Sequence, residues 1–171
     1  SKTHDQDFAQ VEAALLEVME RHPEAYLKLV GVLDESGMEP VQNRIEKLPF
    51  MDWRQLPAVI AGLDINLMPL ENSLFHWCKS ENKWTEAALV KVPSVMSRNC
   101  EMEYVVENGK DGWMCTTKEE WVNALEALVT DEKARKAMGE AAHQKVMEHY
   151  LTVNTGKDAM EELLCSESYT K

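Results

Sequence analysis

Short apolar segments alternate with amphipathic helical segments along the chain, and this order limits the possible folds more than any other feature. Residues 26–33 (YLKLVGVL) are short, apolar and rich in strand-forming residues, so we expect a strand buried on both faces. In residues 8–21 apolar side chains recur every three or four positions, which predicts an amphipathic helix. Strands separated by helices of this kind form a parallel sheet covered on both faces. The sequence therefore predicts one three-layer α/β domain with a mostly parallel sheet. The other expected strands are 44–50, 64–69, 93–97 and 113–115, and the other expected helices are 53–63, 81–90, 103–107, 118–129 and 131–150.

The charge and the hydrophobic content exclude several classes of protein. Hydrophobic residues make up 44% of the chain, an ordinary share for a globular protein. The net charge is −12, and this negative charge argues against nucleic acid or an anionic membrane surface as a general partner. No apolar run approaches the roughly 18–20 residues needed to cross a bilayer, and no signal peptide is visible, so we expect a cytoplasmic protein. The cysteines show no C-x-x-C spacing, so we expect no metal site and no redox motif. They are Cys78, Cys100, Cys115 and Cys165.

The start of the helix expected at 81–90 carries the wrong charge for a purely structural end. Ser80 is a good N-cap residue, and a structural cap would favour Glu or Gln three positions later. That position holds Lys83, and Lys79 lies just before the cap. Cations oppose the positive end of a helix dipole, whereas a bound anion would make them favourable, since helix starts with adjacent lysines bind phosphate. In so acidic a chain, this cluster indicates a local anion site.

The predicted topology places this helix start where ligands bind. In open α/β sheets the ligand lies beyond the carboxyl ends of the strands, where loops lead into helix starts. The turn at residues 79–83 falls at such a place, as do His4 at the beginning of the chain and the turn after Ser97. We expect these three segments to converge. The residues alone leave open that both lysines are solvated surface side chains, or that Lys83 simply pairs with Glu86 one turn later.

Three stretches of the chain resemble one family of enzymes. Residues 79–97 (KSENKWTEAALVKVPSVMS) are similar to the family's helix that carries a Glu, followed by a turn and a Pro-Val type strand. Residues 103–113 are similar to the family segment of a Glu, two apolar residues and a Gly-x-x-Gly turn. Residues 120–135 resemble the pair of helices that follows this segment. Together they resemble the C-terminal, nucleotide-sugar-binding domain of GT-B glycosyltransferases of the retaining, group 1 type. The resemblance covers residues 1–150, which would form the donor-binding domain, and leaves 151–171 as a helical tail with a possible helix at 157–165.

The resemblance implies a fold and a reaction. The domain would be Rossmann-like and would lack its first strand, with the loop after that strand at residues 1–8. It would bind the donor for transfer of a sugar from a nucleoside diphosphate sugar to a polysaccharide or glycoconjugate acceptor, with retention of configuration. The amino-terminal acceptor domain of the same protein would be absent, so this piece alone would be inactive. The parent protein could associate peripherally with a membrane. No cofactor and no obligate metal are implied.

The resemblance also implies roles for particular residues. Glu86 would accept hydrogen bonds from the ribose hydroxyls. The family usually has a sugar-binding Glu eight positions before this one, where this chain has Cys78. A thiol cannot replace a carboxylate as a partner for sugar hydroxyls, so the sugar contact is either made differently here or lost. No catalytic residue is assigned. The other substrate-binding candidates are Lys83, Lys79, Ser80 and His4, toward the diphosphate, and Glu103.

Three other classes of α/β protein compete with this interpretation. A receiver-like signalling domain needs a Lys at the end of its fifth strand and an Asp after its third, but residues 93–97 end without Lys and Asp64 begins a strand instead of following one. A nicotinamide-binding domain needs G-x-G-x-x-G after a strand, and the chain has none. A non-catalytic nucleotide-binding module stays open.

Overall fold

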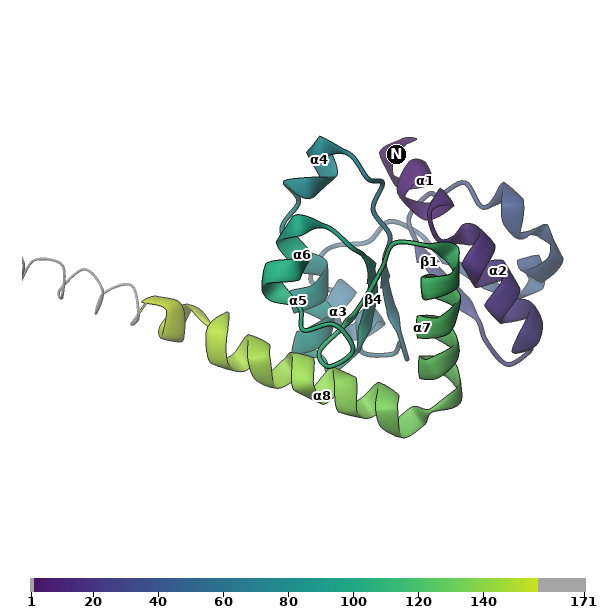
Figure 1. The fold of residues 1–171 in the computed structure, drawn as a ribbon. Coiled ribbons are helices and arrows are strands. Elements are labelled where there is room, and N and C mark those ends of the chain that lie inside the picture. The colour runs from purple at the N-terminus through teal and green to yellow at the C-terminus, as the bar shows by residue number, and fades with distance from the viewer. Residues whose placement is uncertain (1, 157–171) are drawn as a thin grey trace, which may run out of the picture.

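The computed structural model describes residues 2–156, which form an α/β domain from which the last long helix extends (Figure 1). No helix within this range is long and apolar enough to span a membrane. The elements in chain order are α1 (Lys2–Ala9), α2 (Glu12–Arg21), β1 (Leu27–Val30), the 3-10 helix η1 (Ser36–Arg44), β2 (Ile45–Leu48), α3 (Leu56–Ile60), β3 (Asn66–Met68), α4 (Leu74–Trp77), α5 (Asn82–Leu89), β4 (Ser94–Ser97), α6 (Cys100–Val105), β5 (Trp113–Cys115), α7 (Lys118–Thr130) and α8 (Glu132–His149).

All strand pairs are parallel, as the sequence predicts. β4 lies between β3 and β5 in a three-stranded sheet, with Val95 opposite Leu67 on one side and opposite Trp113 on the other. β1 and β2 form a separate two-stranded sheet, with Leu27 opposite Ile45. The predicted class, a mostly parallel α/β domain, is confirmed, although its strands are short and form two small sheets.

Two cores lie on opposite faces of the three-stranded sheet, because successive side chains of a strand point to opposite faces. Val95 belongs to the core formed with α2 and α7, which includes Trp121. The next residue, Met96, belongs to the core formed with α5, α6 and α8, which includes Trp84. Every residue of β4 is buried. The helices thus cover both faces of this sheet, which confirms the three layers.

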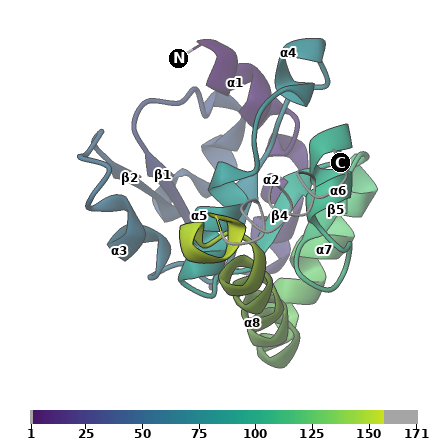
Figure 2. The ribbon, with the colours of Figure 1, turned by 90° about the vertical axis from the view of Figure 1, so that its left-hand side faces the viewer.

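The burial expected for the first strand is wrong. Of the four residues of β1 only Leu27 is buried, and Val30 is 42% exposed. Leu27 and Leu29 on one face of β1 pack in the core, whereas Lys28 and Val30 point to the opposite face and are not buried, so only one face of this strand is covered. β1 and β2 lie at the edge of the molecule (Figure 2).

The boundaries at the beginning of the chain also differ from expectation. The single helix expected at 8–21 is two helices, and α1 begins at Lys2, where a loop was expected. The break could not be seen in the pattern, because Phe8 before it and Val11 and Leu15 after it enter the same core. In addition, α4 lies between the strand expected at 64–69 and the helix expected at 81–90, where no helix was predicted. The helix expected at 157–165 lies outside the described residues.

The apolar face of helix α5 packs against the interior of the domain and holds the helix in place. Trp84, Ala87 and Ala88 are fully buried, and the Trp84 indole N–H donates to the carbonyl of Asp111 at 2.8 Å. At the other end of the helix the Val92 N–H donates to the Ala87 carbonyl, which ends α5 and leads the chain into β4. The opposite face at the start of α5 is therefore held in place and free to meet a ligand.

Candidate functional site

A pocket of about 340 Å³ lies between the end of β3 and the start of α5. This is the carboxyl edge of the sheet, where ligands bind in open α/β proteins. Its lining residues are Met68, Leu70, Lys79, Ser80, Asn82 and Lys83, so three of the six predicted site residues lie together in it.

The cap predicted for α5 is wrong. The N-cap residue is Glu81, the helix begins at Asn82, and no side chain of residues 2–156 caps it. Ser80 lies immediately before the N-cap residue and is exposed, and it lines the pocket. Lys83 becomes the second helical residue. The first backbone N–H groups of a helix have no partner within the helix, and here no side chain takes them, which leaves donors beside the two lysines.

The two lysines have different surroundings. The Lys79 ammonium lies 3.4 Å from Oδ2 of Asp7 and 5.4 Å from the centre of the Phe75 ring. Among the described residues Lys83 has no acidic partner within ion-pair distance, so it does not pair with Glu86. Lys83 is exposed at its surface, yet loss of water around its ammonium lowers its pKa, repulsion from Lys79 lowers it further, and the charges of Asp7 and Glu86 act in the opposite direction. This ammonium would gain most from an anion.

Asp7 is the residue that links these segments, and the sequence analysis missed it. Its side chain is 4% exposed, and its Oδ1 accepts a hydrogen bond from the Glu71 backbone N–H at 2.9 Å. His76 of α4 is also buried, and its Nε2 lies 2.9 Å from the same oxygen. The contact joins α1 to α4 at one end of the molecule (Figures 1 and 2). In the sequence Asp7 stands among polar and acidic residues, a pattern that is typical of a solvated helix face.

The three expected segments do converge. The His4 imidazole, which is half exposed, lies 3.4 Å from Oδ2 of Asp7, the same oxygen that Lys79 approaches. The end of β4 also lies beside the pocket, because the Ser97 hydroxyl accepts a hydrogen bond at 2.9 Å from the backbone N–H of Leu70, a residue that lines the pocket.

The remaining candidates lie outside the pocket. Glu86 is exposed on α5, one turn beyond Lys83, and does not line it. Glu103 lies on α6, where its carboxylate pairs with Arg98 at 3.1 Å. Cys78, at the end of α4, is exposed and is a free thiol. Within residues 2–156 no group of three or more His, Cys, Asp or Glu side chains is arranged to hold a metal ion.

The parallel sheet with helices on both faces, and a pocket lined by two lysines at its carboxyl edge, define a Rossmann-like domain. The chain belongs to the family Glycosyl transferases group 1, whose model matches residues 5–131. No curated protein sequence is significantly similar to the chain.

Solved structures show the same fold. The chain is similar to the C-terminal domain of LpcC, a glycosyl transferase group 1 family protein from Francisella tularensis, with 16% identity, a TM-score of 0.72, and 88% of this chain and 81% of that one covered. It is also similar to HepE from Anabaena in complex with UDP, with 17% identity, a TM-score of 0.71 and coverage of 91% and 45%. WaaG, a glycosyltransferase involved in lipopolysaccharide biosynthesis, matches with 16% identity, a TM-score of 0.69 and coverage of 88% and 42%. The chain thus has the fold of the C-terminal domains of GT-B glycosyltransferases, and it spans less than half the length of HepE and WaaG. The receiver-like alternative is excluded by the family.

Proposed function

We propose that this domain binds a nucleoside diphosphate sugar and serves as the donor half of a glycosyltransferase that transfers the sugar, with retention, to a polysaccharide or glycoconjugate acceptor. One observation carries the proposal: in a chain of the group 1 family, Lys79 and Lys83 line one pocket at the uncapped start of α5. A departing diphosphate needs positive charge and N–H donors placed in advance. Both are present here in protein groups, so the proposed reaction requires no metal ion.

The other roles follow from this placement. Lys83 is the first diphosphate ligand in the proposal, and Lys79 is the second. Glu86, one turn farther along α5, would then meet the ribose, since its two carboxylate oxygens can accept from a vicinal diol. UDP is the first nucleotide to test, because structures of HepE contain UDP and UDP-glucose.

Isothermal titration calorimetry of the chain with UDP, GDP, ADP and CDP tests the proposal. We expect binding of at least one of them, weakened about tenfold by Lys83→Ala, since a charge-assisted hydrogen bond contributes roughly that much. Glu86→Ala should weaken nucleoside diphosphates and leave inorganic diphosphate unaffected, because it acts on the ribose. Lys133→Ala, which removes an exposed lysine of α8, is the matched control and should change nothing. If the chain binds none of the four nucleotides, the proposal that it contains a donor-binding site is contradicted.

A further inference from the structure

Asp7 is a buried carboxylate whose two oxygens face different groups. Oδ1 faces the fixed part of the structure: it accepts from the Glu71 backbone N–H and lies 2.9 Å from His76 Nε2. Oδ2 faces the pocket side, where His4 Nδ1 and Lys79 Nζ each lie 3.4 Å away. Oδ1 thus links α1 to the segment that includes α4, and Oδ2 is left to interact with Lys79 and His4.

His76 is itself locked, which makes Asp7 a rigid reference point. The Ser73 hydroxyl lies 2.6 Å from Nδ1 of His76, and the ring is 3% exposed. The buried Nε2 atom lies 2.9 Å from Oδ1 of Asp7 but makes no hydrogen bond within the described residues, so His76 acts on Asp7 through close packing. Burial of a carboxylate is costly unless charged or polar partners compensate it. The partners of Asp7 are the Glu71 N–H at Oδ1 and the Lys79 ammonium and His4 imidazole near Oδ2, and together with the packed His76 ring they favour one orientation of the carboxylate.

We infer that Asp7 is a positioning residue, which holds the Lys79 ammonium at the wall of the pocket where it meets the donor diphosphate; this inference rests on the function proposed above. A lysine side chain has many rotamers, and ordering it on binding costs conformational entropy. In this structure the ion pair with Asp7 and the contact with the Phe75 ring order it in advance. Lys83 has no ion pair among the described residues, so Lys79 is ordered before the ligand binds and Lys83 is not.

A double-mutant cycle on UDP affinity separates this role from a merely structural one. Asp7→Asn keeps the shape and an oxygen for the Glu71 N–H but removes the charge. It should weaken UDP binding about fivefold in the wild-type background, a coupling typical of residues in contact. In the Lys79→Ala background it should change affinity by less than about twofold, because the residue through which it acts is gone. In the Lys79→Arg background the effect should return, since Arg can again pair with Asp7.

Controls keep the result unambiguous. Glu39→Gln removes one negative charge at an exposed position and should leave UDP affinity unchanged. Circular dichroism establishes that each variant folds, and if Asp7→Asn does not fold, Asp7→Glu, which displaces the charge by one methylene, replaces it in the same cycle. Equal effects of the Asp7 substitution with and without Lys79 would overturn the inference and leave the proposed function standing. If the wild-type chain bound neither UDP nor any of the other three nucleotides, that result would instead contradict the proposed function.

Discussion

At the scale of single residues, Gly139 controls how closely two parts of the fold can approach. A Cβ atom at this position would lie 2.1 Å from the carbonyl oxygen of Lys91 and 3.3 Å from the Pro93 ring. Lys91 lies at the end of α5 with φ +62°, so the obstacle is backbone in a constrained conformation and cannot move aside like a side chain. Gly139→Ala should therefore lower the free energy of unfolding by about 2 kcal/mol, even though Ala favours helix.

Urea denaturation followed by circular dichroism measures this loss, and another glycine provides the control. At Gly62 the nearest atom to an added Cβ is a backbone oxygen 3.5 Å away, an ordinary contact. Gly62→Ala should change the free energy of unfolding by less than about 1 kcal/mol. If the two variants were equally stable, the close approach of α8 to Lys91 would be wrong.

Residues also differ in how visible their roles are in the sequence. Lys79, Ser80 and Lys83 could be predicted as neighbours because they lie within five positions of one another at a helix start, and all three line the pocket. Asp7 could not, since its burial depends on His76 and Glu71, more than sixty positions away. Local patterns carry charge and capping preferences, whereas the burial of a carboxylate is decided by tertiary contacts.

At the scale of elements, the two long helices near the end of the described chain were predictable, and α4 was not. α7 begins with a capping box in which Thr117 and Glu120 satisfy each other's backbone N–H groups, and α8 begins at the Asp131 cap, so their starts are encoded locally. α4 has four residues and no side-chain cap, and the loop in which it lies gave no helical pattern. Strand β5 was predicted within its exact bounds because the turn before it contains Gly109 and Gly112.

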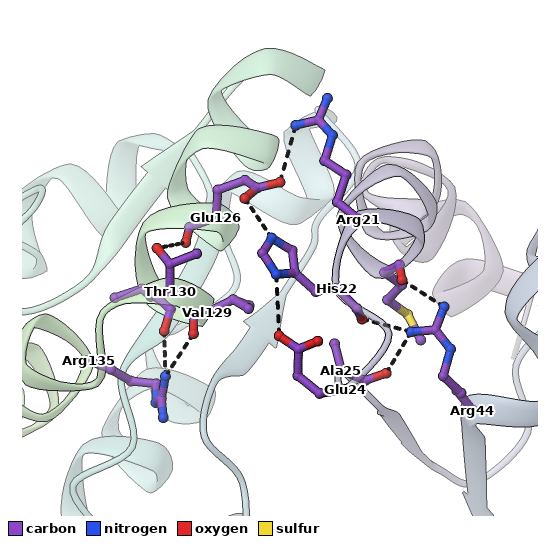
Figure 3. A network of polar contacts seen from close by, with 11 residues as sticks. Arg21, His22, Glu24, Ala25, Arg44, Glu126, Val129, Thr130 and Arg135 are labelled. Atoms are coloured by element: carbon purple, nitrogen blue, oxygen red, sulfur yellow. Dashed lines mark hydrogen bonds and ion pairs between the residues drawn. The ribbon is translucent and has the colours of Figure 1, made fainter.

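A polar cluster joins α2 to α7, and its stability should depend on pH (Figure 3). The His22 Nε2 lies 2.7 Å from Glu126, which also pairs with Arg21 at 3.1 Å. The hydrogen bond to Glu126 raises the pKa of His22 above its ordinary value of 6.5. A raised pKa in the folded state means that the contribution is complete below about pH 6.5 and is lost as pH rises through the folded-state pKa.

Comparison of His22→Gln with the wild type tests this element. The difference in their free energies of unfolding should be largest near about pH 5.5 and should shrink toward about pH 8.5, because the imidazolium gains more from Glu126 than the neutral ring does. His149→Gln, at an exposed position at the end of α8, is the control and should show a smaller dependence. A difference that grew with pH would show that neutral His22 is the stabilising form.

At the scale of the whole molecule, the net charge of −12 opposes both the binding of an anionic ligand and the stability of the folded state. It repels a nucleoside diphosphate at long range, so the attraction of Lys79 and Lys83 must act at short range, within a distance comparable to the Debye length of about 8 Å at physiological salt. Many surface carboxylates also repel one another at neutral pH, which destabilises the compact state. Lowering the pH reduces this repulsion until paired carboxylates begin to be protonated.

Stability should therefore be greatest at mildly acidic pH, between about 4.5 and 6.5. Below this window, carboxylates whose pKa values are lowered by hydrogen bonds lose their contribution, since a lowered folded-state pKa stabilises above the unfolded value of 4.5 and is lost as pH falls through the folded value. Above the window, His22 loses its proton and the net negative charge grows. Urea denaturation across this range tests the prediction, and added salt should flatten both sides because most of these groups are exposed and screened. Stability that rose steadily from about pH 5 to 8 would contradict it, and would mean that repulsion among the carboxylates is too weak to matter. The carboxylates concerned are Glu17, Glu35, Glu107, Glu120, Glu126, Glu132 and Glu140.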